Sequence, residues 1–314
     1  MLEMKNVSVK FSADSDVQAV EDVSLVLPAG GRIALVGETG SGKSVLLLAV
    51  LRLLPEAAQT KGDVLLDGVS IWKMKRRELN RLRGGVISYV PQGGGGSMNP
   101  LMKVGFQVGE PLMEHKGFRK KDAVAKSVDL LRYFHLGSEE TLAQAYPHTF
   151  SGGMRQRAMI AMGIAAGARI LLADEPSKGL DEKRVALVVD AFNRLEEKSI
   201  LCVTHDLMFA SKISDHICVL YAAQQVEFGT TEQILVSPLH PYTLDMIDAI
   251  PENGMKVDQA GFAPPHTGYK NYGCRYRHRC RYCTTQCEKM PPIFDVGDRK
   301  VRCWLYADPN RKAL

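Results

Sequence analysis

The chain has 314 residues, of which 45% are hydrophobic and 24% are charged, and its formal net charge is +5. This composition allows one large core plus an appendage, and no run of 18 uncharged apolar residues predicts a membrane span. The first residues lack the apolar stretch of a signal peptide, so we expect a cytoplasmic protein. The modest charge permits contact with a membrane surface or nucleic acid but requires neither.

Residues 1 to about 90 alternate apolar strands with one strong helix. The run 33–36 predicts a buried strand and the run 45–54 a helix. Between them lies a complete G-x-x-x-x-G-K-[ST] phosphate loop, in the strand, loop and helix order that this motif needs. It consists of Gly37, Glu38, Thr39, Gly40, Ser41, Gly42, Lys43 and Ser44.

The chemistry of this loop predicts a site for a nucleoside triphosphate. Its glycines let backbone N–H groups turn toward a phosphate, and the following helix adds a favourable dipole. Lys43 can reach the outer phosphates, while Ser44 can hold Mg²⁺.

Residues 93 to about 165 are predicted to be mainly helical. Val124, Val128 and Leu131 recur at helical spacing, as expected for one packed face. Near the end of this region, Ser151, Gly152 and Gly153 precede another apolar helix.

Residues 168 to about 250 return to alternating strands and helices. A buried strand at 169–173 ends in Asp174 and Glu175, and a strand at 200–204 ends at His205. Asp174 suits a Mg²⁺ contact opposite Ser44, and Glu175 is placed to polarise an attacking water. Such alternation predicts an α/β fold with a mostly parallel sheet.

In order and spacing, these motifs resemble the ABC ATPase family. The resemblance implies that Ser151, Gly152 and Gly153 form the signature sequence, which serves the ATP of a partner ATPase in a head-to-tail dimer. Gln92 occupies the position of the Q-loop, which senses the metal and the water. Phe11 fits the aromatic residue that stacks on adenine. His205 contacts the γ-phosphate.

The resemblance also gives meaning to two unusual segments. Four glycines at 93–96 follow Gln92, and such a run imposes little backbone preference. We interpret it as a hinge between the core and the helical subdomain rather than as a tolerated surface loop. Ser177 to Asp181 fills the D-loop position, where Lys178 and Gly179 depart from the commoner residues.

Everything after Pro251 is loop-rich, and five of the seven cysteines lie between Cys274 and Cys303. In the cytoplasm, metal ligation is a better expectation than disulfides. Zinc sites usually begin with a gap of two to four residues, whereas four thiolates with longer gaps suit a cubane iron–sulfur cluster. Unligated thiols are the third alternative.

This last region resembles the C-terminal extension of dipeptide, oligopeptide and nickel importer ATPases, some of which carry an iron–sulfur cluster. The resemblance implies a [4Fe-4S] cluster, or alternatively Zn²⁺, bound by Cys274, Cys280, Cys287 and Cys303, with Cys283 as a possible substitute. Arg281 and Cys283 are departures from the pattern.

We therefore predict an ABC ATPase domain at 1–250, with a mostly parallel sheet, an antiparallel β part and a helical subdomain at about 93–165, followed by a cysteine-rich extension at 251–314. The function implied is that of an ATPase subunit that couples MgATP hydrolysis to import of peptides, nickel or a metal chelate.

The partners implied are a second ATPase subunit, forming a heterodimer, two transmembrane permeases and an extracytoplasmic solute-binding protein, at the cytoplasmic face of the inner membrane. No nucleic-acid partner is expected. The alternative is a soluble ABC ATPase with a metal-binding module that acts on nucleic acid or within a metabolic enzyme complex.

Overall fold

The computed structural model describes residues 1–11, 17–92, 97–251, 254, 263–265, 267–269 and 272–308. Its residues form two compact units. The loop unit comprises Met1–Val26, Ile33–Trp72 and His205–Leu314, and the helical unit comprises Leu27–Arg32 and Lys73–Thr204. The glycines at 93–96, interpreted as a hinge, lie outside the described residues. The predicted boundary at residue 250 stays a prediction.

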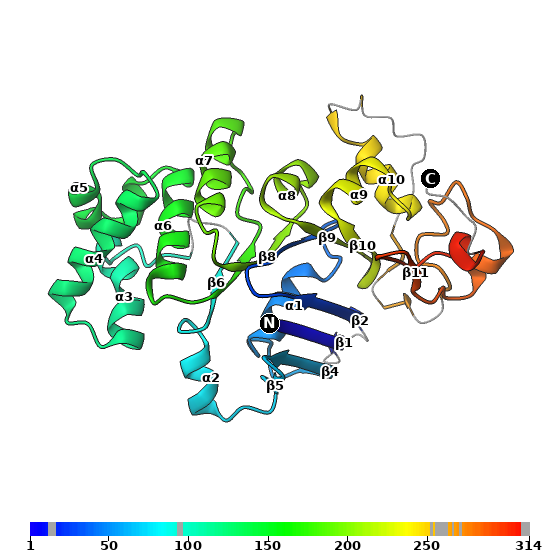
Figure 1. Cartoon of the computed structure of the whole chain (residues 1–314), viewed down its shortest axis with the longest axis horizontal. Helices are drawn as coiled ribbons and strands as arrows, with labels where there is room; N and C mark the ends of the chain where they lie inside the picture. The colour runs from blue at the N-terminus through cyan, green and yellow to red at the C-terminus, as the bar shows by residue number, and fades with distance from the viewer. Residues whose placement is uncertain are drawn as a thin grey trace. The chain divides into compact units, whose positions relative to one another are not determined.

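The loop unit is built on a mixed sheet with the strand order β5-β4-β1-β2-β10-β9-β3. Figure 1 shows its first strands, β1, β2 and β4, side by side. β1 pairs antiparallel with β4, and β9 with β10, whereas β3 runs parallel to β9. The strands are β1 (Leu2–Phe11), β2 (Val17–Leu27), β3 (Arg32–Val36), β4 (Ala58–Leu66), β5 (Val69–Ser70), β9 (His216–Tyr221) and β10 (Gln224–Thr230).

The end of the chain adds to the same sheet. β12 (Arg299–Val301) pairs antiparallel with β10 and also with β11 (Phe294–Val296). The residues beyond α10 therefore share backbone hydrogen bonds with β10, which lies two strands from β3 in the same sheet. The helices of the loop unit are α1 (Lys43–Val50), α8 (Leu207–Ile213), α9 (Thr231–Val236) and α10 (Pro241–Asp248), with short 3-10 turns at Thr285–Glu288 and Trp304–Ala307.

The strand before the phosphate loop is almost fully buried. Ile33, Ala34, Leu35 and Val36 are at most 2% exposed, as expected for a parallel strand that is covered on both faces. The predicted buried strand is confirmed. The helix after the loop begins at Lys43, two residues before the predicted start.

The helical unit holds three parallel strands in the order β8-β7-β6. Figure 1 shows its helices α3, α4, α5 and α6 packed together. The strands are β6 (Ile87–Val90), β7 (Ile170–Asp174) and β8 (Ser199–Thr204). The helices are α2 (Arg76–Leu82), α3 (Val104–Lys116), α4 (Lys120–Tyr133), α5 (Glu139–Gln144), α6 (Gly152–Ala165) and α7 (Glu182–Asn193).

The packed face of α4 differs slightly from the prediction. Its buried residues are Ala123, Ser127 and Leu131, and the predicted Val124 and Val128 are only half-buried beside them. The small residues Ala123 and Ser127 suit close packing, since a Cβ on Gly109 of α3 would lie 2.7 Å from the Ala123 carbonyl oxygen. In the part of the chain that the structure describes, no helix has the length and apolarity needed to cross a bilayer.

Candidate functional site

The phosphate loop closes tightly between β3 and α1, and two of its glycines are required by geometry. Gly37 has φ 152° and Gly42 has φ 98°, in the region that favours glycine. A Cβ on Gly37 would lie 2.0 Å from the Leu220 carbonyl oxygen, and one on Gly42 would lie 2.0 Å from that of Ala19. Any larger residue would push the loop away from the sheet.

The ammonium of Lys43 lies inside this loop. Its Nζ donates to the carbonyl oxygens of Gly37, at 2.7 Å, and Glu38, at 2.8 Å, and Ser41 Oγ lies 3.4 Å away. Lys43 and Ser41 are about 5% exposed, whereas Thr39 and Gly40 at the tip are exposed. The arrangement presents a cation to an anion that enters from the tip.

In the helical unit, Asp174 is the last residue of β7 and Glu175 follows it, so the two acids lie at the end of this strand, as predicted. Asp174 is 3% exposed, and its Oδ2 accepts a hydrogen bond of 3.2 Å from the Tyr89 hydroxyl. Burial and the Asp174 charge raise the pKa of Tyr89, so this hydroxyl remains a donor. A carboxylate buried to this degree suits a cation as its partner.

Glu175 has an unusual backbone. Its φ is 48°, a left-handed conformation that is uncommon for residues other than glycine. The backbone N–H of Glu175 donates to the Val203 carbonyl oxygen of β8 at 2.8 Å, which holds the turn, and the residue is 8% exposed. Backbone strain of this kind concentrates at functional sites.

The predicted signature sequence lies at the start of α6. Ser151 is the N-cap, and its Oγ accepts a hydrogen bond from the Met154 backbone N–H at 3.3 Å. Gly152 and Gly153 form the first turn, where N–H groups and the helix dipole favour an anion. A Cβ on Gly153 would lie 3.3 Å from Arg184 Cβ, so the glycine also permits close packing.

The remaining predicted residues are divided between the two units. In the loop unit, Phe11 ends β1, and His205 is exposed just before α8. In the helical unit, Gln92 is exposed two residues after β6. The loop unit thus holds the phosphate loop with Phe11 and His205, and the helical unit holds the acids, Gln92 and the signature.

Sequence reasoning missed two residues that contact the phosphate loop. The Tyr242 hydroxyl accepts a hydrogen bond from the Glu38 backbone N–H at 2.9 Å, and Arg279 Nη1 lies 2.7 Å from Glu38 Oε1. Both come from the C-terminal part of the chain, more than 200 residues away. The spacing of residues along the sequence cannot predict contacts between residues this far apart in the chain.

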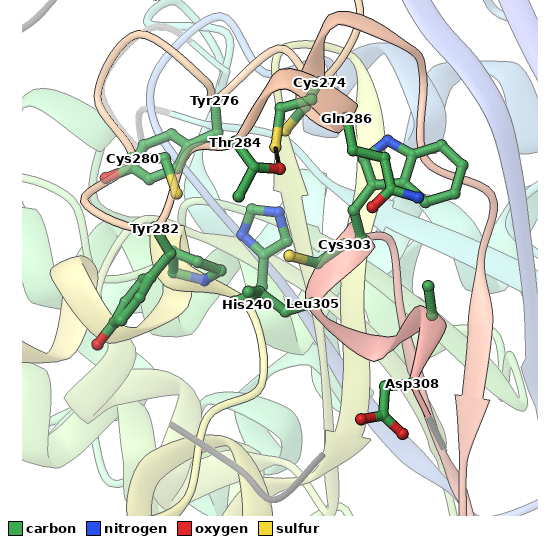
Figure 2. Close-up of a pocket in the computed structure, with 14 residues that line it drawn as sticks. His240, Cys274, Tyr276, Cys280, Tyr282, Thr284, Gln286, Cys303, Leu305 and Asp308 are labelled. Atoms are coloured by element: carbon green, nitrogen blue, oxygen red, sulfur yellow. Dashed lines mark hydrogen bonds between the residues drawn. The ribbon is translucent and has the colours of Figure 1, made fainter. Parts of the chain in front are cut away.

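Four of the cysteines line one cavity of about 290 Å³, drawn in Figure 2. They are the four predicted as ligands, Cys274, Cys280, Cys287 and Cys303. Cys283 is exposed and does not line the cavity, while Cys202 and Cys218 lie in the core. All seven cysteines belong to the described residues, and none forms a disulfide.

The environment of these thiols favours their neutral form when nothing is bound. Burial raises the pKa of Cys274 to about 11 and that of Cys280 and Cys303 to about 12. His240, which sequence reasoning also missed, lines the same cavity, and Figure 2 draws it among the cysteines. Burial lowers the pKa of His240 to about 3, so this imidazole is neutral.

The predicted metal ligands do not converge on a single point. Within the described ranges, no group of three or more His, Cys, Asp or Glu side chains is arranged to hold a metal ion. The predicted cluster or zinc site is therefore supported only by the fact that its four cysteines line one cavity. Their side chains are not arranged around a single ion.

Comparison with known proteins matches two segments of the chain. A family model described as ABC transporter matches residues 20–178. A second model, for the C-terminal region of oligopeptide/dipeptide transporters, matches residues 226–287.

Two curated relatives match almost the whole chain. The oligopeptide transport ATP-binding protein OppD of Haemophilus influenzae is 37% identical, with 98% of each chain covered. The dipeptide transport ATP-binding protein DppD of Lactococcus lactis is 36% identical, with 99% of this chain and 92% of that chain covered.

Solved structures agree with these relatives. A bacterial ABC transporter cassette solved as a dimer has a TM-score of 0.65 and 25% identity, covering 74% of this chain and 99% of that chain. A dimeric ATP-binding cassette in a post-hydrolysis state with ADP and phosphate has a TM-score of 0.66, with the same identity and coverage. The chain thus belongs to the ABC transporter family of ATPases, and its last part carries the C-terminal region of the oligopeptide/dipeptide transporters.

Proposed function

We propose that this chain is the ATP-binding subunit of an importer that uses MgATP hydrolysis to take up dipeptides or oligopeptides. The observation that supports this most is the closed phosphate loop around the Lys43 ammonium, in a chain that also carries a peptide-transporter C-terminal region. Two relatives are named for oligopeptide and dipeptide transport. The nickel and metal-chelate alternatives have no such support.

In the loop unit, Lys43 would exchange its loop carbonyl partners for the β- and γ-phosphates. Ser44 would hold Mg²⁺, Phe11 would stack on adenine, and His205 would contact the γ-phosphate. MgATP supplies the phosphoryl group, and the residues bind and orient it.

In the helical unit, Asp174 would be the second Mg²⁺ contact, since its buried carboxylate ends a parallel strand. Glu175 would accept the proton of the attacking water. Gln92 would sense the metal and the water and relay their presence to the membrane subunits.

A dimer would complete the site. Ser151, Gly152 and Gly153 offer a helix N-terminus to an anion, and we assign them to the ATP of a second ATPase subunit in a heterodimer. Two solved relatives are dimeric cassettes, which supports dimerisation. Two permeases and a solute-binding protein would complete the importer, with this chain peripheral at the cytoplasmic face of the membrane.

We also propose that a [4Fe-4S] cluster occupies the cysteine cavity, with Cys274, Cys280, Cys287 and Cys303 as ligands. In a cubane each thiolate binds a different iron, so the four sulfurs need not converge on one point. The cavity volume of about 290 Å³ also exceeds by far the ~10–15 Å³ that a single water needs on the same kind of measure. Zinc is the alternative, and it would need the thiols to move together.

The alternative functions, on nucleic acid or within an enzyme complex, would use the same ATP chemistry but would not require a transporter C-terminal region. The match at residues 226–287 favours a transporter. A peptide-stimulated ATPase activity of the complex reconstituted in vesicles with its permeases would separate these functions, since the alternatives require no membrane subunit.

Glu175→Gln tests the chemical assignment. It should keep ATP binding and lower hydrolysis roughly 10²-fold or more, because it removes a positioned base. The measurement is turnover in a complex whose other ATP site is inactivated. Near-normal turnover would show that the assignment of Glu175 is wrong.

Ser151→Arg tests the dimer. It should leave ATP binding by this chain unchanged and reduce hydrolysis at the partner's site. Full activity of a dilute, strictly monomeric wild-type preparation would contradict the shared site.

Anaerobic purification tests the cluster. About four irons per chain are expected for a cubane. One zinc and no colour would favour the alternative, and five freely alkylated thiols in a metal-free folded protein would end both.

A further inference from the structure

Glu38 places a carboxylate within the phosphate loop itself. Its side chain is 41% exposed, and it directly precedes the exposed tip residues Thr39 and Gly40. A negative charge at this position repels the phosphates of a nucleotide unless a cation offsets it. The cation found there is Arg279, whose guanidinium lies 2.7 Å from the carboxylate.

Arg279 is held in place by aromatic rings of the loop unit. Its guanidinium lies 5.8 Å from the centre of the Tyr221 ring and 5.4 Å from that of Tyr276. These rings pack with Tyr242, at centroid distances of 4.5 and 5.4 Å. All three tyrosines are at most 2% exposed, so Arg279 reaches Glu38 from a rigid base.

Tyr242 makes the second contact from the same cluster. Its hydroxyl accepts the Glu38 backbone N–H at 2.9 Å. The loop is therefore held at one residue through both its backbone and its side chain. Fixing a glycine-rich loop before a ligand arrives lowers the entropy that binding must remove.

We propose that Arg279 and Tyr242 are positioning residues for the phosphate loop, which act through Glu38 to favour nucleotide binding. Arg279 neutralises the Glu38 carboxylate, and Tyr242 fixes the loop backbone. The C-terminal part of the chain thereby contributes to ATP affinity. This inference rests on the proposed function only in that the loop binds ATP.

A double-mutant cycle between residues 38 and 279 tests the proposal. MgATP and MgADP binding would be measured by calorimetry on the full chain carrying Glu175→Gln, which should keep ATP binding and slow hydrolysis. Arg279→Gln should weaken ATP binding on the order of fivefold, the upper range for a partly exposed pair. The same change in a Glu38→Gln background should cost less than about twofold, since the carboxylate that needs a partner is gone.

The nucleotide dependence separates positioning from general damage. Arg279→Gln should weaken ATP binding more than ADP binding, because the unpaired Glu38 repels the more highly charged ligand more strongly. A purely structural defect would affect the two nucleotides equally. Arg277→Gln is the matched control, since Arg277 lies in the same segment over the Tyr272 ring, 5.5 Å from its centre. It should leave both affinities unchanged.

Tyr242→Phe tests the second contact, because it keeps the ring and removes the acceptor. A rise in the ATP dissociation constant of about twofold to fivefold is expected for one lost hydrogen bond. If Arg279→Gln unfolds, Tyr242→Phe and Glu38→Gln still test the contact from the loop side. Equal effects of Arg279→Gln in both backgrounds would overturn the inference, whereas a wild-type chain that binds no ATP would overturn the proposed function.

Discussion

The phosphate loop and the cysteine cavity lie in the same compact unit, but they are built in opposite ways. The loop consists of eight consecutive residues whose own carbonyls hold Lys43. The cavity gathers thiols from positions 274 to 303, together with His240. A contiguous motif carries its geometry within itself, whereas a dispersed one depends on the contacts that bring its parts together.

Those contacts include a buried ion pair next to His240. Glu227 of β10 is 0% exposed, and it accepts hydrogen bonds from the backbone N–H groups of Leu239 and His240. Its carboxylate also lies 2.6 Å from the Arg299 guanidinium of β12. One side chain thus joins the sheet, the chain before α10 and the last strand.

Breaking the Glu227–Arg299 pair should have the largest effect on stability, because the cysteine cavity depends on such long-range contacts and the phosphate loop does not. Glu227→Gln leaves the Arg299 guanidinium buried without its charge partner, which typically costs about 3–5 kcal/mol of the free energy of unfolding. Chemical denaturation would measure it. Asp295→Asn is the control, because the Asp295–Lys300 pair is exposed and should contribute less than about 1 kcal/mol. A similar loss of stability in Glu227→Gln and Asp295→Asn would show that the buried pair contributes no more than the exposed one.

A substitution inside the phosphate loop should act locally. Gly42→Ala forces a Cβ to within 2.0 Å of the Ala19 carbonyl oxygen at a positive φ, and left-handed geometry alone costs about 1–2 kcal/mol for a residue with a side chain. We expect the ATP dissociation constant to rise more than about tenfold. Gly68→Ala, at φ 81° with open space around its Cβ, should leave ATP affinity unchanged. Equal affinities for the two variants would contradict the steric explanation.

Cysteine substitutions test which thiols of the cavity act as ligands. If the proposed cluster is present, Cys303→Ser should remove it and lower the melting temperature by several degrees, about 2–4 °C for each kcal/mol of lost stability in a large domain. Cys283→Ser, outside the cavity, should retain the metal and the melting temperature. Iron content and thermal unfolding would be measured together. Loss of metal in Cys283→Ser alone would reverse the ligand assignment.

The smallest effect concerns pH in the metal-free protein. Burial raises the pKa of Cys280 and Cys303 from near 9 to about 12 in the folded chain. The folded state therefore holds these protons more tightly than the unfolded state, so the stability that they contribute is present below pH 9 and is lost as the pH rises toward 12. Denaturation at pH 8 and pH 10 should show a decrease, and Cys303→Ser should show a smaller one. Equal stability at pH 8 and pH 10 would contradict the raised pKa of these buried thiols.

The same contrast explains what could be predicted from sequence. The strand at 33–36, the loop and the acids at the end of β7 are local patterns, and each lies where it was expected. The contacts of Glu38 with Tyr242 and Arg279 join residues more than 200 positions apart. No spacing rule reaches that distance, because such contacts arise only when the sheet brings β9, β10 and α10 beside the loop.

The cysteine cavity was only partly predictable from the sequence. The resemblance to importer ATPases implies four ligands, and the fold brings those four to one cavity and leaves Cys283 outside. His240 was missed because a lone histidine before a proline has no ligand pattern of its own, and its backbone position is set by Glu227.

The order of strands in the loop unit also matters during synthesis. β3 pairs with β9, which begins at His216, 180 residues after β3 ends at Val36. At ~5–20 residues per second, a ribosome needs roughly 10 to 40 s to make that stretch. For this time the apolar edge of β3 lacks its native neighbour β9, a state prone to aggregation. The nucleotide loop that follows β3 is thus among the first parts of the chain to be made and among the last to be completed.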